Sequence, residues 1–205
     1  GESIIITAGL QKPGTGGSAQ SLRLEARGEN DIIPKVDELT RQVKEGLDLT
    51  RAQLAGDVEA NAGKITTSSP EALKYYIEGR KRHFRMENEQ AIAYYEKAIA
   101  IDPEFAMAYR ALATAHDNLG HIAERRKYIE KASELSARLP ENERLIIEAQ
   151  IYYWNEDYPK AIEVLGRLLK AYPGHSLGYW HLSLNYYAVG DIGKAIEERE
   201  LGVQI

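Results

Sequence analysis

The stretch "NEQAIAYYEKAIAIDPEFAMAY", residues 88–109, decides the fold because part of it is repeated. Its block KAI at 97–99 returns at 160–162 and again at 194–196. Apolar residues in the stretch recur at i, i+1, i+4, i+7 and i+8, which places them on one stripe of a helix. These residues are Ala91, Ile92, Tyr95, Ala98 and Ile99. A recurring helical block is typical of stacked packing units and not of a globular enzyme.

The spacing of the recurring block gives the length of the repeat. The second helix of each predicted pair opens near Ala91, Arg125, Ala161 and Ala195, at intervals of 34, 36 and 34 residues. The two extra residues fall within 137–144, where a turn between repeats tolerates insertion. A helix-turn-helix unit of this length predicts a repeat domain over 71–205. Its repeats are expected at about 71–104, 105–139, 140–174 and 175–205.

Capping residues mark where some of these helices begin and end. Ser69 followed by Pro70 predicts a helix start, because the hydroxyl accepts a hydrogen bond from a free backbone N–H and proline has no N–H to satisfy. Gly120 and Gly190 predict helix ends, where a left-handed backbone conformation is common. From residue 71 onward the whole pattern is helical.

The first 49 residues have a different pattern and predict a partial α/β module. The run 3–10 is rich in β-branched residues and predicts a strand, and 11–18 contains the Pro and Gly residues of a loop. Residues 19–28 alternate as a half-buried strand does. The stretch 31–49 predicts a helix, whose apolar face consists of Ile33, Val36, Leu39, Val43 and Leu47. We interpret residues 50–70 as a linker.

Composition limits the classes of function. The 205 residues carry a net charge of −5, which argues against a nucleic-acid partner. The absence of cysteine excludes disulfides and thiolate chemistry. The sequence contains no run of 18 apolar residues, so we expect no membrane insertion within this fragment. The start at Gly-Glu-Ser and the helical pattern up to residue 205 lead us to expect a piece of a longer protein. Its compartment is left open, with the cytoplasm favoured.

The helical region resembles the tetratricopeptide repeat family over about two thirds of the chain. The family pattern of an aromatic residue, Leu, a small residue, Tyr, a Gly-Asp turn and Ala is most complete in the last repeat, in Tyr179, Leu182, Ser183, Tyr186, Gly190, Asp191 and Ala195. The resemblance implies a mainly α fold, a solenoid of about four helical hairpins preceded by the small strand-strand-helix segment. Arg125, Arg82 and Gly202 depart from the pattern, and we expect looser packing there.

A second resemblance extends upstream of the repeats. The sequence from residue 65 looks like the C-terminal repeats of bacterial signalling proteins, in which a kinase, a nucleotide cyclase or a winged-helix regulator comes first. Residues 1–49 look like the end of a module similar to the TolB amino-terminal domain. These resemblances imply a bacterial origin and a sensory or scaffolding role.

Several candidate chemical sites have simpler explanations. In "KPGTGGS", at 12–18, no lysine follows the glycines and a strand comes next, so a hairpin loop fits better than a phosphate-binding loop. The histidines are His83, His116, His121, His175 and His181. None forms an i, i+4 pair with a carboxylate partner, so the sequence predicts no metal site. No catalytic residue and no cofactor are predicted.

The repeat alignment does predict a binding surface. In this fold the first helix of each repeat lines a concave groove, and aromatic residues and arginine dominate binding energy at such surfaces. The groove is predicted to contain Tyr76, Arg80, His83, Arg110, Thr114, Asp117, Gln150, Tyr153, Trp180, Leu184 and Tyr187. The alternative is that the aromatic residues pack against a neighbouring helix or a second chain. The Lys and Asn pattern of family members that clamp a C-terminal carboxylate is absent.

The leading hypothesis is therefore a non-enzymatic module that binds a protein or peptide segment in the groove. An element for homo-oligomerisation is a second hypothesis. A third is the regulatory tail of an upstream kinase, cyclase or transcription regulator.

Overall fold

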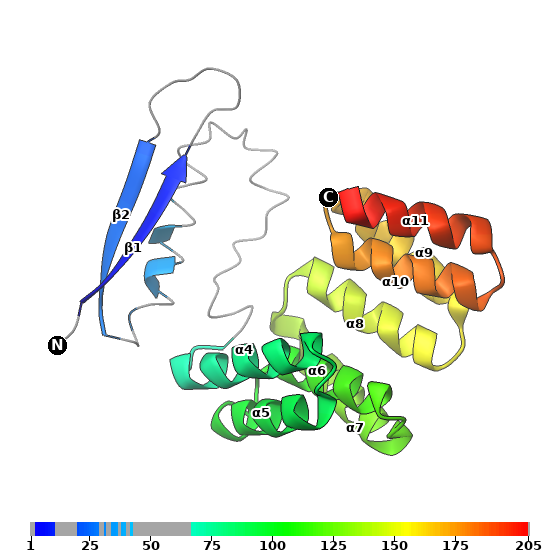
Figure 1. Cartoon of the computed structure of the whole chain (residues 1–205), viewed down its shortest axis with the longest axis horizontal. Coiled ribbons are helices and arrows are strands. Elements are labelled where there is room, and N and C mark those ends of the chain that lie inside the picture. Colours follow the sequence, from blue (N-terminus) through cyan, green and yellow to red (C-terminus); the bar gives the residue numbers. More distant parts are fainter. Residues whose placement is uncertain are drawn as a thin grey trace. The chain divides into compact units, whose positions relative to one another are not determined.

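The computed structural model shows a mainly α-helical chain with a small sheet at its N-terminal end (Figure 1). It describes residues 3–10, 20–28, 31, 34–36, 38–39, 42 and 67–204. The strands are β1 (Ser3–Leu10) and β2 (Gln20–Arg27). The helices are α4 (Pro70–Phe84), α5 (Asn88–Ile101), α6 (Ala106–Asn118), α7 (Ile122–Glu134), the 3₁₀ turn η2 (Ser136–Arg138), α8 (Glu141–Trp154), α9 (Tyr158–Ala171), α10 (Ser176–Ala188) and α11 (Ile192–Gln204).

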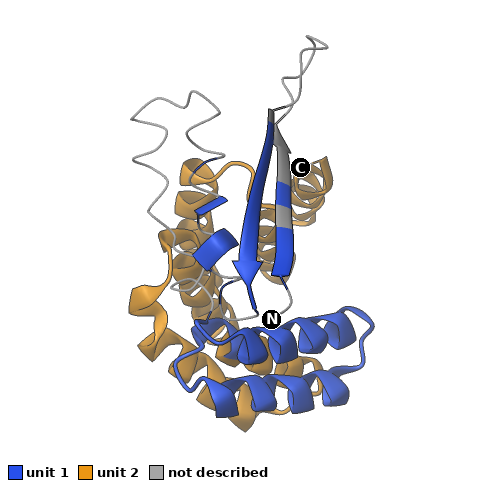
Figure 2. Ribbon diagram, turned by 90° about the vertical axis from the view of Figure 1, so that its left-hand side faces the viewer, with its two compact units in different colours: residues 1–108 blue, residues 109–205 orange. Residues whose placement is uncertain are grey.

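The chain divides into two compact units, 1–108 and 109–205, and the division falls within α6 (Figure 2). Successive helices form antiparallel pairs, α4 with α5, α8 with α9 and α10 with α11. The mainly α-helical fold built from helical hairpins, predicted from the sequence, is confirmed. Each helix pair falls within one expected repeat, except that α4 begins one residue earlier, at Pro70. The 3₁₀ turn η2 accompanies the longer interval between the second and third repeats.

The two N-terminal strands pair as predicted. β1 and β2 are antiparallel, with Ser3 opposite Arg27 and Leu10 opposite Gln20. The predicted loop at 11–18 lies outside the described residues, as do residues 50–66 of the predicted linker. The TolB-like character of this segment stays a prediction.

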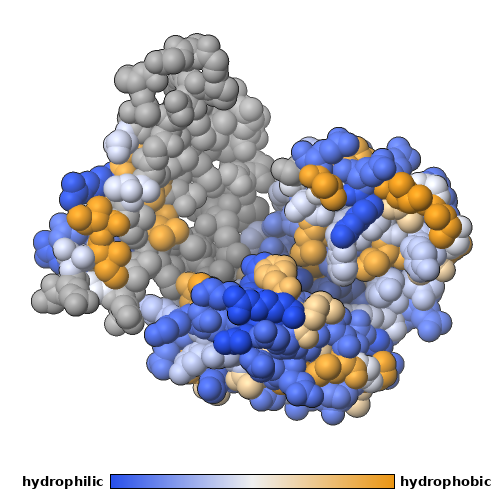
Figure 3. All heavy atoms as spheres, in the orientation of Figure 1, coloured by the Kyte–Doolittle hydropathy of each residue, from blue (hydrophilic) through white to orange (hydrophobic). Residues whose placement is uncertain are grey.

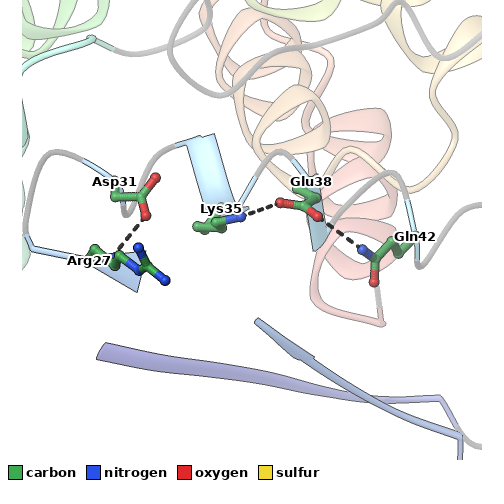
Figure 4. A network of polar contacts seen from close by, with 5 residues as sticks. All are labelled: Arg27, Asp31, Lys35, Glu38 and Gln42. Atoms are coloured by element: carbon green, nitrogen blue, oxygen red, sulfur yellow. Dashed lines mark hydrogen bonds and ion pairs between the residues drawn. The ribbon is translucent and has the colours of Figure 1, made fainter. Parts of the chain in front are cut away.

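Short-range polar contacts follow β2 (Figure 4). The backbone N–H of Arg27 donates to the Asp31 carboxylate at 2.9 Å. Within the predicted helix 31–49, the described residues 34–36, 38–39 and 42 are helical. Glu38 accepts from the Lys35 ammonium at 2.7 Å and from Gln42 Nε2 at 3.4 Å, spacings that match one helix face. Of the predicted apolar face, Ile33, Val43 and Leu47 lie outside the described residues.

The start of α4 has the predicted cap. Ser69 Oγ accepts a hydrogen bond from the backbone N–H of Ala72 at 3.2 Å, and Pro70 occupies the first turn. The backbone N–H of Ser69 donates to Thr67 Oγ1 at 3.1 Å, and this hydroxyl donates to the Asp102 carboxylate. Thr67 is buried. The cap therefore ties the start of α4 to the residue that follows α5.

The four turns within the hairpins share one backbone geometry. In each turn the N–H of residue i+5 donates to the carbonyl of residue i at 2.9–3.0 Å, namely Glu87 to Arg82, His121 to His116, Asp157 to Tyr152 and Asp191 to Tyr186. The residue before each donor has a positive φ: Met86 (62°), Gly120 (74°), Glu156 (61°) and Gly190 (84°). Glycine adopts this conformation without a steric cost. The predicted helix ends at Gly120 and Gly190 are these turn residues.

An apolar cluster lies in the core of unit 2. It consists of Leu145, Ile146, Ala149, Val164, Leu165, Leu168 and Leu182, from α8, α9 and α10. Leu165 and Leu168 have no exposed surface. Three helices therefore share this cluster, as expected when neighbouring hairpins bury a common face.

The sites expected to be loosely packed are not loose. At Gly202, a Cβ atom would lie 2.9 Å from Tyr179 Cβ, so only glycine allows α10 and α11 to approach this closely. The expectation of looser packing is wrong there. Arg125 replaces a small residue, and its guanidinium pairs with Asp117 at 2.9 Å and lies 5.2 Å from the Trp154 ring centroid. Arg82 pairs with Glu87 at 2.9 Å.

Candidate functional site

The predicted groove residues of unit 1 divide between core and surface. Tyr76 is buried, with its ring centroid 4.9 Å from that of Phe105 and 5.8 Å from that of Tyr95. It therefore stabilises the core and offers no surface to a partner. Arg80 is exposed, and its guanidinium lies 5.2 Å from the ring centroid of the exposed Phe84. His83 is half-buried beside Phe84.

In unit 2, the predicted residues of α6 contact those of α8. Arg110 Nη2 lies 3.8 Å from Glu143 Oε2, and both side chains are mostly covered. Gln150 Nε2 donates to Thr114 Oγ1 at 3.4 Å. Gln150 is buried, so its carboxamide acts between the helices and not on a surface.

Asp117 is fully engaged within unit 2. One carboxylate oxygen accepts from Arg125 Nη1 at 2.9 Å, and the other accepts from Trp154 Nε1 at 3.0 Å. The carboxylate thus joins α6 to α7 and α8. The sequence placed Asp117 in the groove, and in the structure both of its carboxylate oxygens accept hydrogen bonds from other helices of unit 2.

Tyr153 lies beside Tyr158, with ring centroids 5.7 Å apart. Burial raises the pKa of the Tyr153 hydroxyl, and the nearby Tyr158 and Asp117 add to this shift. The hydroxyl therefore stays protonated at neutral pH and is able to donate a hydrogen bond.

The predicted residues of α10 form the most exposed part of the candidate site. Trp180 is 37% exposed and Tyr187 is 67% exposed, and Leu184 between them is half-buried. Leu177 is 37% exposed and continues the same spacing of three and four residues. We call Leu177, Trp180, Leu184 and Tyr187 the α10 face. Leu177 was missed from the sequence, although its spacing from Trp180 would have indicated it.

His181 lies directly behind the α10 face. Its ring makes an edge contact with Trp180, with centroids 4.8 Å apart, and the residue is buried. Burial lowers the pKa of the His181 imidazole to about 3, and the positive charges of Arg110 and His175 contribute. The ring is therefore neutral in the folded protein at physiological pH.

This buried histidine predicts a loss of stability in mild acid. The folded pKa lies below the unfolded value of 6.5, so the unfolded chain binds more protons as the pH falls below 6.5. We expect the free energy of unfolding of unit 2 to fall by about 2 kcal/mol between pH 7 and pH 5 because of this group. Urea unfolding followed by circular dichroism measures it. The variant His181→Leu is expected to lose that part of the pH dependence, and an unchanged slope would contradict the assignment.

Within 67–204 and the described N-terminal segments, no group of three or more His, Asp or Glu side chains is arranged to hold a metal ion. No helix among the described residues has the length and apolar character needed to cross a bilayer. Among the histidines, the structure does bring His116 and His121 together, a pair that the sequence did not indicate.

One family model and several solved structures are similar to parts of this chain. A family model described as tetratricopeptide repeat matches residues 87–105 and 108–138. No curated protein matches the chain. The chain is similar to the crystal structure of MamA, with 22% identity, a TM-score of 0.40, and coverage of 62% of this chain and 73% of that one.

Two further solved structures are similar. MamA 41-end from Desulfovibrio magneticus RS-1 has 19% identity and a TM-score of 0.44, with 66% of this chain and 76% of that chain covered. A putative kinesin light chain from Podospora anserina, with nearly identical TPR-like repeats, has 17% identity and a TM-score of 0.43, with 86% and 92% covered. The match over residues 87–105 and 108–138 confirms, for this part of the chain, the resemblance to tetratricopeptide repeats found in the sequence.

Proposed function

We propose that this chain is a non-enzymatic interaction module that binds a peptide or protein segment on the inner helices of its repeats. Tetratricopeptide repeats are typically non-catalytic interaction modules, and this supports the proposal. The observation that carries it is the α10 face, where Trp180 and Tyr187 keep a large exposed area beside Leu177. Exposed aromatic residues in an apolar patch are the usual centre of a binding surface.

The α10 face sets the chemistry of the segment that it would accept. Its side chains recur along one side of a helix, so a segment with apolar side chains at a regular spacing would contact several of them at once. Buried His181 supports the Trp180 ring from behind, which lowers the entropy lost when the ring is fixed by a partner. Gln150 and Tyr76 are buried, so the proposed site no longer includes them.

Selection of peptides from a displayed random library on the purified chain tests the proposal. We expect the variant Trp180→Ala to bind the selected peptides at least about tenfold more weakly, because a central aromatic residue carries much of the binding energy. Val203→Ala is the matched control, since Val203 is 77% exposed but lies on α11. Equal binding by Trp180→Ala and the unaltered chain would contradict the proposal.

Self-association is a second candidate function, favoured by a separate observation. On α11, Ile192 is 48% exposed and Ile196 is 55% exposed, one helical turn apart, and Val203 continues the apolar side (Figure 3). A second copy would cover these side chains. Analytical ultracentrifugation tests this, because Ile196→Glu should dissociate a dimer, and a monomer at high concentration would exclude it.

We also propose, from the resemblance of the sequence to bacterial regulatory proteins, that the module belongs to a larger signalling protein. The coding sequence upstream of Gly1 tests this proposal. A kinase, cyclase or winged-helix domain is expected there, and an unrelated enzyme would contradict it.

A further inference from the structure

The turn between α6 and α7 contains two histidines whose rings face each other. His116 lies in the last turn of α6, and His121 comes directly before α7. Their Nδ1 atoms are 3.2 Å apart, and their ring centroids are 5.4 Å apart. His116 is buried, whereas His121 is exposed, so the space between the two nitrogens adjoins the surface.

The structure holds both rings in place. The backbone N–H of His121 donates to the carbonyl of His116 at 2.9 Å, which fixes the separation of the two residues. The ring of His116 stacks on that of Tyr128, with an angle of 17° between the planes and 5.3 Å between the centroids. The two Nδ1 atoms therefore come together because of the fold of the turn, and a ligand need not bring them together.

The other three hairpin turns have different side chains at the two positions that His116 and His121 occupy. In the first repeat the same two positions hold Arg82 and Glu87, which form an ion pair. In the last two repeats they hold a tyrosine and an aspartate, and a lysine pairs with the aspartate and lies over the tyrosine ring. The second repeat instead places two identical bases face to face. Their two Nδ1 atoms face each other at 3.2 Å.

We propose that His116 and His121 form a binding site for one divalent transition-metal ion of the zinc type, held by both Nδ1 atoms. In tetrahedral coordination with Zn–N distances of 2.0–2.1 Å, two nitrogen ligands lie about 3.3 Å apart. The observed 3.2 Å matches this separation without movement of the backbone. Water molecules would complete the coordination.

The protons balance in a simple way. In the metal-free pair one imidazole donates its Nδ1–H to the other Nδ1. On metal binding, that imidazole changes to the tautomer with its proton on Nε2, and both Nδ1 lone pairs then face the ion. No net proton is released. On α7, Arg125 pairs with Asp117, and Lys127 lies 5.1 Å from the Tyr128 ring centroid. This site does not depend on the proposed binding of peptides.

This site was not indicated by the sequence, because the familiar pattern of two histidines on one helix has a spacing of four residues. Here the spacing is five, and a turn with a positive φ at Gly120 closes the distance.

Titration of the ¹⁵N-labelled chain with Zn²⁺, followed by NMR of the histidine ring nitrogens, tests the proposal. We expect one equivalent of Zn²⁺ to shift the Nδ1 signals of His116 and His121, with His83 and His175 unaffected. The absence of a shift in excess Zn²⁺ would overturn the proposal and leave a hydrogen-bonded pair only. Equal shifts at the other histidines would overturn it as well.

Two variants make the test specific. His121→Asn keeps a residue that favours the position before a helix, and it removes one of the two ligands. We expect Zn²⁺ affinity to fall by at least about tenfold, as for other losses around a metal site. His83→Gln is the matched control, because it removes a histidine outside the pair, and its affinity should be unchanged. If His121→Asn binds Zn²⁺ as tightly as the unaltered chain, the proposal that His116 and His121 hold the ion is wrong. Circular dichroism checks that both variants are folded.

Discussion

Replacement of Leu165 by alanine is expected to lower the free energy of unfolding of unit 2 by about 2–5 kcal/mol. Leu165 has no exposed surface and lies in the cluster that α8, α9 and α10 share. The substitution removes buried methyl groups and leaves a cavity that helices from two neighbouring hairpins cannot easily collapse into. Urea unfolding, followed by circular dichroism and by tryptophan fluorescence, measures the change.

Val203→Ala is the control for this prediction. Val203 is 77% exposed, so its loss should change the free energy of unfolding by at most about 0.5 kcal/mol. Equal effects of the two substitutions would mean that the shared cluster does not stabilise unit 2.

Replacement of Gly79 by valine is expected to lower the free energy of unfolding of unit 1 by about 3 kcal/mol. A Cβ atom at Gly79 would lie 2.5 Å from Tyr95 Cε1 and 2.6 Å from Tyr95 Cδ1. The Tyr95 ring has almost no exposed surface and packs against Tyr76, so it has no room to move aside. The helices α4 and α5 would have to separate. Thermal and urea unfolding report this change.

Gly166→Val in α9 is the matched control. A Cβ atom there has no neighbour within 4 Å among the described residues, so only helix propensity changes. Valine is slightly better than glycine in a helix, by about 0.4 kcal/mol, and this variant should be neutral or slightly more stable. If Gly79→Val were also neutral, the close contact between α4 and α5 would not exist.

Most of the helical fold follows from local patterns in the sequence. The interval between Ala91 and Arg125 gave the repeat, and Ser69 and Gly190 marked helix ends through effects that act within a few residues. The two strands were equally local, because β-branched residues at 3–10 and alternation at 19–28 predicted them.

The candidate site was less predictable because it depends on contacts between hairpins. Each residue advances about 100° around a helix, so a neighbour in sequence can point into the core or away from it. Tyr76 was predicted to line the groove but packs on Phe105, whereas Trp180 at the corresponding place keeps an exposed ring. Arg125 broke the pattern of small residues, and its pairing with Asp117 and Trp154 is visible only in three dimensions.

The shared geometry of the four hairpin turns has a consequence for how this protein can change over time. The same backbone hydrogen bond, from residue i+5 to residue i, closes each turn. The side chains of these two residues are therefore not needed to form the turn. An ion pair, a tyrosine and an aspartate joined by one lysine, and two facing imidazoles therefore occupy the same two turn positions in different repeats. Natural variation or engineering can therefore replace these two side chains in one turn by those of another turn. This would introduce a new local chemistry without a change in the helical scaffold.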